Sequence, residues 1–149
     1  MKTGLVTTLL LALVAVGPAW AQPATSPVGV WQTVDDKTGE VRGAVRLFES
    51  NGIIYGKIER VFDPKAMGQN CVKCTDDRRN KPILGLDVIR GARPDGPNYW
   101  TGGEILDPET GDTYRVTLRL EDEGRKLVVR GSILGGMIGR SQTWQRAKS

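Results

Sequence analysis

Residues 40–62 read EVRGAVRLFESNGIIYGKIERVF, and this stretch predicts the fold more strongly than any other part of the chain. Apolar and polar residues alternate on both sides of Asn51-Gly52, as in β-strands with one buried and one wet face. Asn-Gly between two such runs is the strongest short signal of a β-hairpin, because both turn positions need a positive φ angle. The stretch therefore predicts two antiparallel strands joined by a two-residue turn.

Similar alternating runs lie on both sides of this hairpin. Further strands are expected at residues 28–34, 83–90, 98–106, 112–121, 126–134 and 139–146. Turn signals separate them, such as ARPDGP from Ala92 and DPETG from Asp107. No segment after the N-terminal region has a convincing amphipathic helical period. Eight short strands predict an all-β fold, an antiparallel up-and-down eight-stranded β-barrel, because closure removes the exposed edges.

The first 21 residues have the features of a secretory signal peptide. Lys2 precedes an apolar run, Leu5 to Val16, and Ala19-Trp20-Ala21 is a small-x-small cleavage motif. The run is shorter than the roughly 17 residues that a membrane-spanning helix needs. We expect cleavage between Ala21 and Gln22. Residues 22–149 would then form a single β-barrel domain that is periplasmic or secreted, without a membrane span.

Composition limits the possible functions. The chain has 149 residues, a net charge of +4 and no histidine. The lack of histidine excludes Ser-His-Asp and Cys-His catalysis and histidine metal ligands. The basic residues are scattered rather than gathered with aromatic residues, which argues against a nucleic-acid partner. We therefore expect no catalytic residue, no metal and no cofactor. An enzyme that uses the cysteines, or the carboxylates of Glu104, Asp107 and Asp112, is kept as an alternative.

Residues 63–82 lack any periodic pattern, and loops of this length are usually functional or disordered. They contain Cys71 and Cys74 in NCVKC, for which three interpretations are open. A structural zinc site needs two more ligands than this motif supplies, and a thioredoxin-type redox centre needs a following helix. A disulfide needs only an oxidising compartment, so export favours a disulfide that stiffens the loop.

Three motifs resemble a family of exported bacterial proteins, the domain of unknown function 2147 family. They are a GVW first strand, WTGGEILDPETGDTY from Trp100 to Tyr114, and RGSILGG from Arg130 to Gly136, followed by Gln142 and Trp144. The resemblance covers nearly all of residues 22–149. It implies a lipocalin-like, calycin-type barrel and no particular activity.

The first and last strands also resemble the closure of calycin barrels. Gly29 and Trp31 lie on the first strand, and Arg140 or Arg146 lies on the last. We assign the closing role to Arg146, whose guanidinium would stack on the Trp31 indole and contribute about 0.5–2 kcal/mol. These three residues, Gly29, Trp31 and Arg146, are expected to be structural.

Several aromatic residues suggest a ligand site inside the barrel. An eight-stranded barrel is just wide enough to be filled by side chains or to hold one small ligand. If Trp144 points inward, the period of two places Arg140 and Gln142 on the same face, as in a site for an acid-headed ligand. The expected ligand contacts are Trp100, Tyr114, Arg140, Gln142 and Trp144. The sequence thus predicts binding of a small amphipathic or lipid-like molecule. The alternative is an envelope accessory protein without a ligand, whose protein partner is unknown.

Overall fold

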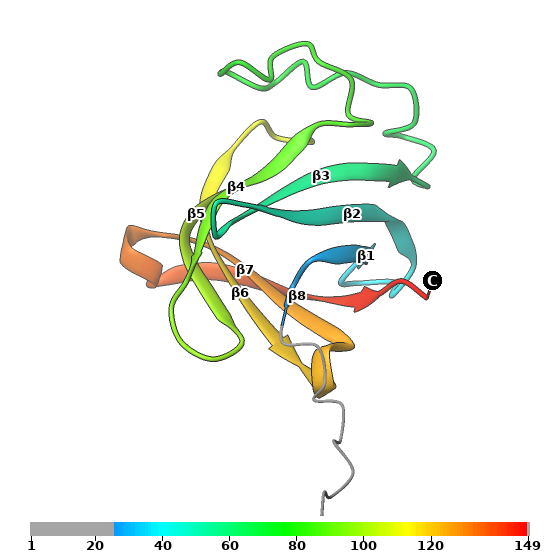
Figure 1. Ribbon diagram of the computed structural model, residues 1–149. Coiled ribbons are helices and arrows are strands. Elements are labelled where there is room, and N and C mark those ends of the chain that lie inside the picture. The colour runs from blue at the N-terminus through cyan, green and yellow to red at the C-terminus, as the bar shows by residue number, and fades with distance from the viewer. Residues whose placement is uncertain (1–25, 149) are drawn as a thin grey trace, which may run out of the picture.

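The computed structural model describes residues 26–148; the predicted signal peptide, residues 1–21, and its cleavage site lie outside them. Across residues 26–148 eight antiparallel strands follow one another: β1 (Gly29–Val34), β2 (Val41–Ser50), β3 (Ile53–Val61), β4 (Asp87–Pro94), β5 (Tyr99–Leu106), β6 (Thr113–Glu121), β7 (Lys126–Ile133) and β8 (Ile138–Arg146). Each strand pairs with the next, and β1 pairs with β8 to close the barrel (Figure 1). The predicted all-β, up-and-down barrel is confirmed.

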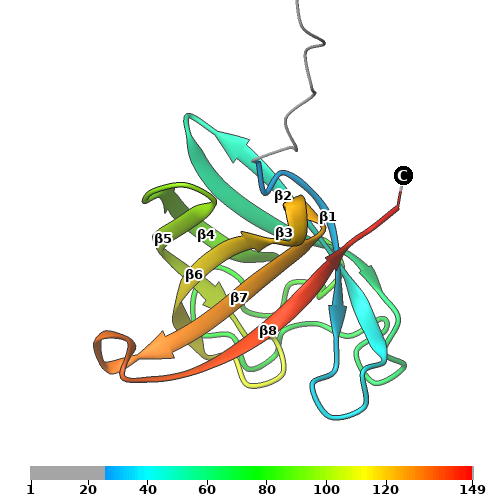
Figure 2. The ribbon, with the colours of Figure 1, turned by 90° about the horizontal axis from the view of Figure 1, so that it is seen from below.

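The connections alternate between the two ends of the barrel. Short turns follow β2, β4 and β6, and the first of these is the predicted Asn51-Gly52 turn with both φ angles positive. The connections after β1, β3, β5 and β7 lie at the other end, along the lower side of Figure 2. We call this the open end, because a cavity opens there, and the opposite end the closed end.

β4 begins four residues later than the sequence predicts. The expected strand was residues 83–90, whereas the observed strand is Asp87–Pro94. Gly85 has a φ of 85°, which interrupts the extended backbone, and Leu86 is buried beside the cysteines instead of extending the strand. The predicted ARPDGP turn therefore starts too early, because Pro94 still pairs with β5. A proline is tolerated there because strand ends do not need its missing N–H.

The barrel interior holds one continuous hydrophobic core. Its buried members come from every strand: Trp31, Val45, Leu47, Ile54, Val88, Ile89, Ala92, Trp100, Val116, Leu118, Leu120, Leu127, Val129 and Trp144. On β6 the buried residues Val116, Leu118 and Leu120 follow the predicted alternation. The core therefore fills much of the barrel, and the remaining space lies toward the open end.

Helical structure is confined to two single turns within residues 26–148, η1 (Asp122–Gly124) and η2 (Leu134–Gly136). No helix in this part of the chain is both long and apolar enough to cross a membrane.

Candidate ligand-binding cavity

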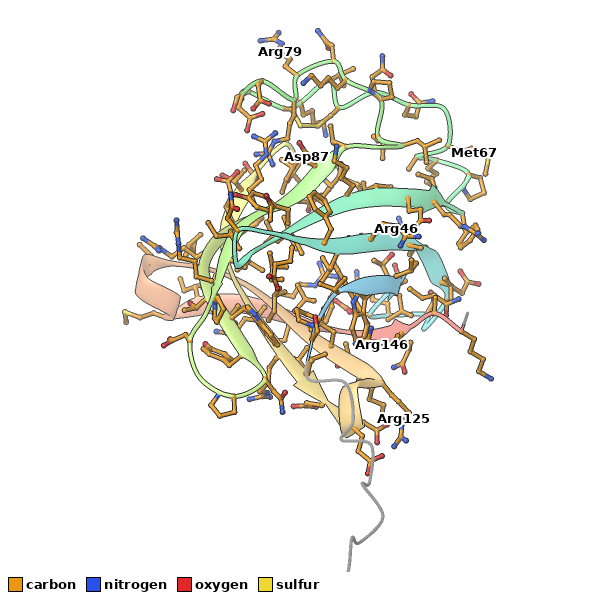
Figure 3. All side chains as sticks on the ribbon, viewed as in Figure 1. Arg46, Met67, Arg79, Asp87, Arg125 and Arg146 are labelled. Carbon is orange, nitrogen blue, oxygen red and sulfur yellow. A yellow bond between two sulfur atoms is a disulfide. The ribbon has the colours of Figure 1, made fainter. Side chains whose placement is uncertain are left out.

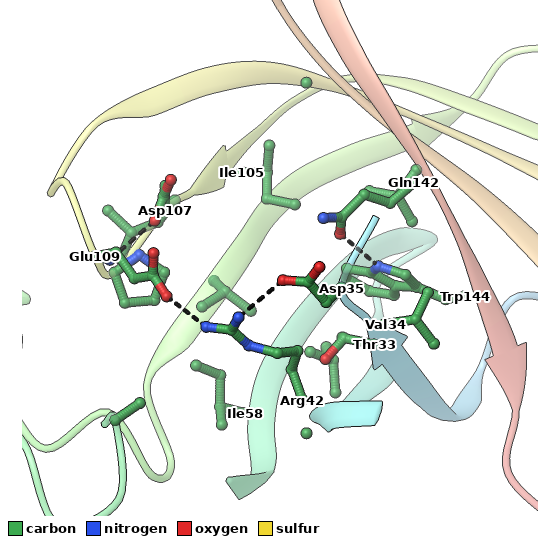
Figure 4. A pocket seen from close by; sticks show the side chains of 18 of the residues that line it. Thr33, Val34, Asp35, Arg42, Ile58, Ile105, Asp107, Glu109, Gln142 and Trp144 are labelled. Carbon is green, nitrogen blue, oxygen red and sulfur yellow. Dashed lines mark hydrogen bonds and ion pairs between the residues drawn. The ribbon is translucent and has the colours of Figure 1, made fainter. Parts of the chain in front are cut away.

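A cavity of about 560 Å³ lies at the open end of the barrel (Figure 4). Its walls are mainly apolar and include Ile58, Val88, Ile105 and Val129. Sites for small molecules usually have volumes of roughly 300–1,000 Å³ and walls of this kind. The cavity is therefore large enough to take a small organic molecule rather than only water.

One face of β8 contributes the aromatic and polar side chains of the cavity. Arg140, Gln142 and Trp144 all line it, two residues apart on the strand. The Trp144 indole Nε1 donates a hydrogen bond of 3.1 Å to the Gln142 Oε1, which orients the Gln142 amide (Figure 4). Tyr114 of β6 also lines the cavity. The structure thus brings four of the five predicted ligand residues together.

Trp100, the fifth predicted ligand residue, does not line the cavity. It is the second residue of β5, which begins at the closed end, and its side chain is buried in the core opposite Leu118. Trp144 belongs to the same core but also borders the cavity, so an inward-facing aromatic residue need not reach the cavity.

A carboxylate of the protein already occupies the polar part of the β8 face. Asp36, in the connection between β1 and β2, accepts hydrogen bonds from Arg140 Nε at 2.6 Å and from Gln142 Nε2 at 3.4 Å. The Arg140 Nη2 lies 2.5 Å from the same oxygen. Arg140 and Gln142 can therefore converge on one carboxylate group.

Arg42, at the start of β2, joins three of the four connections at the open end. Its guanidinium forms ion pairs with Asp35 and Glu109, both at 2.9 Å (Figure 4), and with Asp63. These carboxylates belong to the connections after β1, β5 and β3, respectively. One arginine thus holds three carboxylates and fastens three loops around the mouth of the cavity.

Asp35 is held as a turn residue as well as an ion-pair partner. The backbone N–H groups of Thr38 and Lys37 donate to its carboxylate, at 2.9 and 2.8 Å. These bonds, followed by the hydrogen bond from Arg42, hold the pKa of the Asp35 carboxyl below its ordinary value, although partial burial opposes them. Asp35 is consequently ionised at neutral pH, and its carboxylate is held in place at the mouth of the cavity.

Arg60, near the end of β3, also lines the cavity. It is exposed and pairs across the sheet with Ala44, beside an irregularity in the register of β2 and β3. It has no carboxylate within ion-pair distance among the described residues, whereas Arg42 and Arg140 each have one or more. Arg60 is thus a positive charge at the cavity that no described carboxylate neutralises.

The structure contains a disulfide between Cys71 and Cys74. Both cysteines are buried and pack with Leu86 and Leu106 in a small cluster separate from the main core. Within residues 26–148 no group of three or more potential ligands is arranged to hold a metal ion. The disulfide therefore forms the apolar underside of residues 70–82, which we call the disulfide loop.

Ion pairs fasten the disulfide loop to β4 and β5. Arg78 is only 1% exposed; it pairs with Asp76 and donates to Glu104 at 3.0 Å. Arg90 of β4 makes two bonds of 2.9 Å to Asp77, and these lower the pKa of the Asp77 carboxyl to about 2.

Two of the three carboxylates of the enzyme alternative, those of Glu104 and Asp107, also have structural partners. Glu104 is bound by Arg78, and the Asp107 carboxylate accepts the backbone N–H of Glu109 at 2.9 Å. In Asp107 this is the side-chain-to-backbone bond typical of aspartate in a turn.

Gly29, Trp31 and Arg146 meet where β1 and β8 close the barrel. The Arg146 guanidinium lies 4.3 Å from the Trp31 ring centroid and donates to the backbone oxygens of Gly124, Val28 and Ser26. Burial lowers the pKa of Arg146. A Cβ at Gly29, whose φ of 139° already disfavours other residues, would lie 2.7 Å from Nη1, so the guanidinium would have to shift. Arg140 belongs to the cavity instead.

Sequence reasoning missed Asp36, Arg42 and Arg60. All three lie within or next to a connection that follows an odd-numbered strand. In an up-and-down barrel these connections share one end, so their charged residues could have been grouped from the strand order alone. Their pairing, however, depends on loop conformations that have no sequence period.

The comparisons with known proteins agree with this architecture. A protein-family model described as an uncharacterized protein conserved in bacteria, DUF2147, matches residues 29–146. No curated protein matches the chain. A solved structure from the human pathogen Helicobacter pylori, described as belonging to the lipocalin family, is similar with a TM-score of 0.73 and 22% identity, over 84% of this chain and 85% of that one. The fold is lipocalin-like, and the chain belongs to the DUF2147 family.

Proposed function

We propose that this protein binds a small amphipathic molecule with an acidic head group, whose apolar part enters the cavity. The observation that carries the proposal is the pairing of an apolar cavity with a carboxylate-binding group at its mouth. Arg140 and Gln142 bind the Asp36 carboxylate in the structure. A ligand carboxylate or phosphate of the same geometry can replace Asp36 there, because a bidentate or convergent arginine contact suits both groups.

The remaining charges at the mouth agree with this assignment. Asp35, Asp63 and Glu109 are already bound by Arg42, and Asp107 accepts a backbone N–H. Arg60 supplies an additional positive charge without a described partner. Both free and exchangeable cationic groups therefore face the cavity, while the acidic groups are engaged in holding the loops.

Decanoate and decanol are suitable probes, because they share an apolar chain and differ in the head group. Isothermal titration calorimetry of the chain starting at Gln22 should show tighter binding of decanoate than of decanol. Equal affinities would refute the acidic-head assignment, and a lack of binding by both probes would count against the ligand-binding function itself.

The variant Asp36→Asn should bind decanoate about tenfold more tightly, because the internal competitor for Arg140 loses its charge. The matched control is Glu40→Gln, which removes an exposed carboxylate from the same connection without touching the cavity. If Asp36→Asn leaves the decanoate affinity unchanged, Arg140 and Gln142 are not the head-group site.

A second pair of variants tests the location of the apolar chain. Ile105 lines the cavity, so Ile105→Trp should fill part of it and weaken decanoate binding. Thr143 is exposed on β8, between the inward-facing Gln142 and Trp144, so Thr143→Trp adds the same bulk outside the barrel. Decanoate affinity should fall only in Ile105→Trp.

The same proposal places the protein outside the cytoplasm, in the periplasm or the medium. Its support is the signal-peptide pattern of residues 1–21. An oxidising compartment is also where a disulfide such as Cys71–Cys74 persists. N-terminal sequencing of protein from a periplasmic fraction should begin at Gln22; an unprocessed chain in the cytoplasmic fraction would overturn this placement.

A further inference from the structure

The exposed apolar side chains of this barrel are concentrated at one end. Among residues 26–148, every exposed large apolar side chain except Val28 lies in or beside a connection of the open end: Val41, Phe62, Met67, Val72, Leu84, Ile133, Leu134, Met137 and Ile138. The turns of the closed end are polar and contain Asn51, Asp95, Asn98, Asp122 and Glu123. The two ends of the molecule therefore differ in the polarity of their exposed side chains.

The densest part of this surface is the tip of the β7–β8 hairpin. Ile133, Leu134, Met137 and Ile138 surround two glycines, and Leu134 and Met137 are 68% and 86% exposed. The tip projects away from the rest of the barrel in both ribbon views (Figures 1 and 2). Such exposure of large apolar groups marks an interaction site.

The hairpin that carries this tip is basic. Residues 126–146 include four arginines and lysines, Lys126, Arg130, Arg140 and Arg146, and no aspartate or glutamate. Arg130 and Arg140 stand in neighbouring cross-strand pairs, so they point to opposite faces of the hairpin. Arg140 faces the cavity and is paired with Asp36, whereas Arg130 faces outward and its Nη2 donates a hydrogen bond of 3.2 Å to the backbone oxygen of Gly136 in the tip. A cation at the base of an apolar tip suits a bilayer surface, where apolar groups enter the acyl boundary and cations meet the phosphate groups.

We propose that the open end docks on an anionic phospholipid bilayer, with the β7–β8 tip as the apolar anchor. The other exposed apolar groups belong to separate loops around the mouth, and Met67 and Arg79 both point outward from the β3–β4 connection (Figure 3). An array of separate tips around a mouth suits an extended lipid surface better than the groove or pocket that a protein segment needs.

Docking would place the mouth of the cavity next to lipid. Ile133 and Ile138 belong both to the exposed tip and to the cavity wall, so apolar surface is continuous from one to the other. Leu134 and Met137 do not line the cavity. The docking surface and the ligand site can therefore be tested separately, and docking does not depend on the proposed ligand.

Vesicle flotation with the chain starting at Gln22 tests the proposal. The protein should float with vesicles that contain phosphatidylglycerol mixed with phosphatidylcholine and bind pure phosphatidylcholine far more weakly. The double variant Leu134→Ser/Met137→Ser should reduce partitioning at least about tenfold, because two large apolar side chains are lost. The matched control is Val28→Ser, which removes the exposed apolar side chain that lies away from the open end and should leave flotation unchanged.

The charge contribution has its own test. Arg130→Gln should weaken binding to the anionic vesicles about fivefold, and Arg130→Lys should retain it, because each cation near such a surface contributes similarly. Full flotation of the tip variant, or no flotation of the parent chain with anionic vesicles, would overturn the proposal. Decanoate titration of the tip variant in the absence of vesicles should match the parent, which separates this result from failure of the ligand-binding function.

Discussion

At the residue scale, closure of the barrel depends on Arg146. Its guanidinium stacks on Trp31 and donates to the backbone oxygens of Ser26 and Val28, which precede β1, and of Gly124 in the β6–β7 turn. A cation–π contact of a partly desolvated pair contributes up to about 2 kcal/mol, and each hydrogen bond to a charged group contributes roughly 1.5–3 kcal/mol, part of which water replaces. This one side chain therefore links β1, β8 and the β6–β7 turn.

The variant Arg146→Ala should lower the free energy of unfolding by about 2–3 kcal/mol, because the carbonyl oxygens lose their donor and Trp31 loses its cover. Urea denaturation monitored by circular dichroism measures the change. Arg93→Ala is the control, since Arg93 is exposed and has no ion pair within the described residues; its effect should stay within about 0.5 kcal/mol. Equal effects of the two substitutions would show that the Arg146 contacts do not stabilise the fold.

The Asp77 carboxyl group predicts that the folding stability depends on pH. Its pKa lies at about 2 instead of 3.8, chiefly because of the hydrogen bonds from Arg90. A carboxyl with a depressed pKa stabilises the folded state fully above its ordinary pKa, and this contribution is lost as the pH falls through the folded value. The stability of Asp77→Asn should therefore differ from that of the parent above about pH 4 and converge with it toward about pH 2.

Urea midpoints measured at a series of pH values give this difference. Asp112→Asn serves as the control, because Asp112 is exposed and has no ion pair among the described residues. The difference in urea midpoint between Asp112→Asn and the parent should not change over the same pH range. A constant difference for Asp77→Asn at all pH values would contradict the assigned role of the Asp77–Arg90 pair.

At the element scale, the disulfide loop and the β5–β6 turn depend on each other. A Cβ at Gly111 would overlap the backbone oxygen of Lys73, and Gly111 has a φ of 79°. Cys71 Sγ lies 3.6 Å from the backbone oxygen of Pro108, in the same turn. The turn and the loop therefore contact each other backbone to backbone, which only a glycine at position 111 permits.

Gly111→Ala should destabilise the protein by at least about 1 kcal/mol more than Gly39→Ala. Gly39 has a similar φ of 72°, but a Cβ at this position would meet nothing within 4 Å, so the comparison isolates the clash from the backbone strain. Hydrogen exchange should show faster exchange of the disulfide-loop amides in Gly111→Ala only. Identical stabilities and exchange rates of Gly111→Ala and Gly39→Ala would mean that the contact between the turn and the disulfide loop does not stabilise the fold.

Removing the disulfide should leave the barrel folded and lower its stability only moderately. A ring of four residues contributes about 2 kcal/mol in the loop-entropy description, and the loop also keeps its ion pairs to β4 and β5. The double variant Cys71→Ser/Cys74→Ser should remain folded, with its unfolding free energy lowered by about 2 kcal/mol. Thermal denaturation with and without reductant checks this, because reductant should destabilise the parent but not the variant.

At the scale of the whole molecule, Arg42 connects three loops that are far apart in the sequence. Arg42→Ala should leave the barrel folded and speed amide exchange in the connections after β1, β3 and β5, because each loses an ion pair. Because Arg42 is half-exposed and its ion pairs lie at the surface, the effect on global stability should be small. Arg46→Ala, which breaks a pair with Glu59 alone, should leave these connections unchanged; equal exchange in both variants would exclude the linking role.

The sequence by itself determined the strands, their order and most of their inward faces. Alternation with a period of two and the Asn51-Gly52 turn are local signals, so they can be interpreted without knowledge of the rest of the chain. The error at β4 is also local in origin: Ile83 and Leu86 have strand-like character, but they are buried elsewhere in the fold. Proximity of Arg140, Gln142 and Trp144 followed from the same period of two.

Only the tertiary structure decided which charged groups meet and where space remains. Asp36 reaches Arg140, and Arg42 reaches Glu109, across separations of about a hundred and about seventy residues, respectively. Barrel closure creates these contacts, and irregular loops with no periodic pattern position them. Trp100 and Trp144 are both buried in the core, yet only Trp144 also borders the cavity. That difference depends on how side chains from several strands pack around each ring, which no local pattern in the sequence specifies.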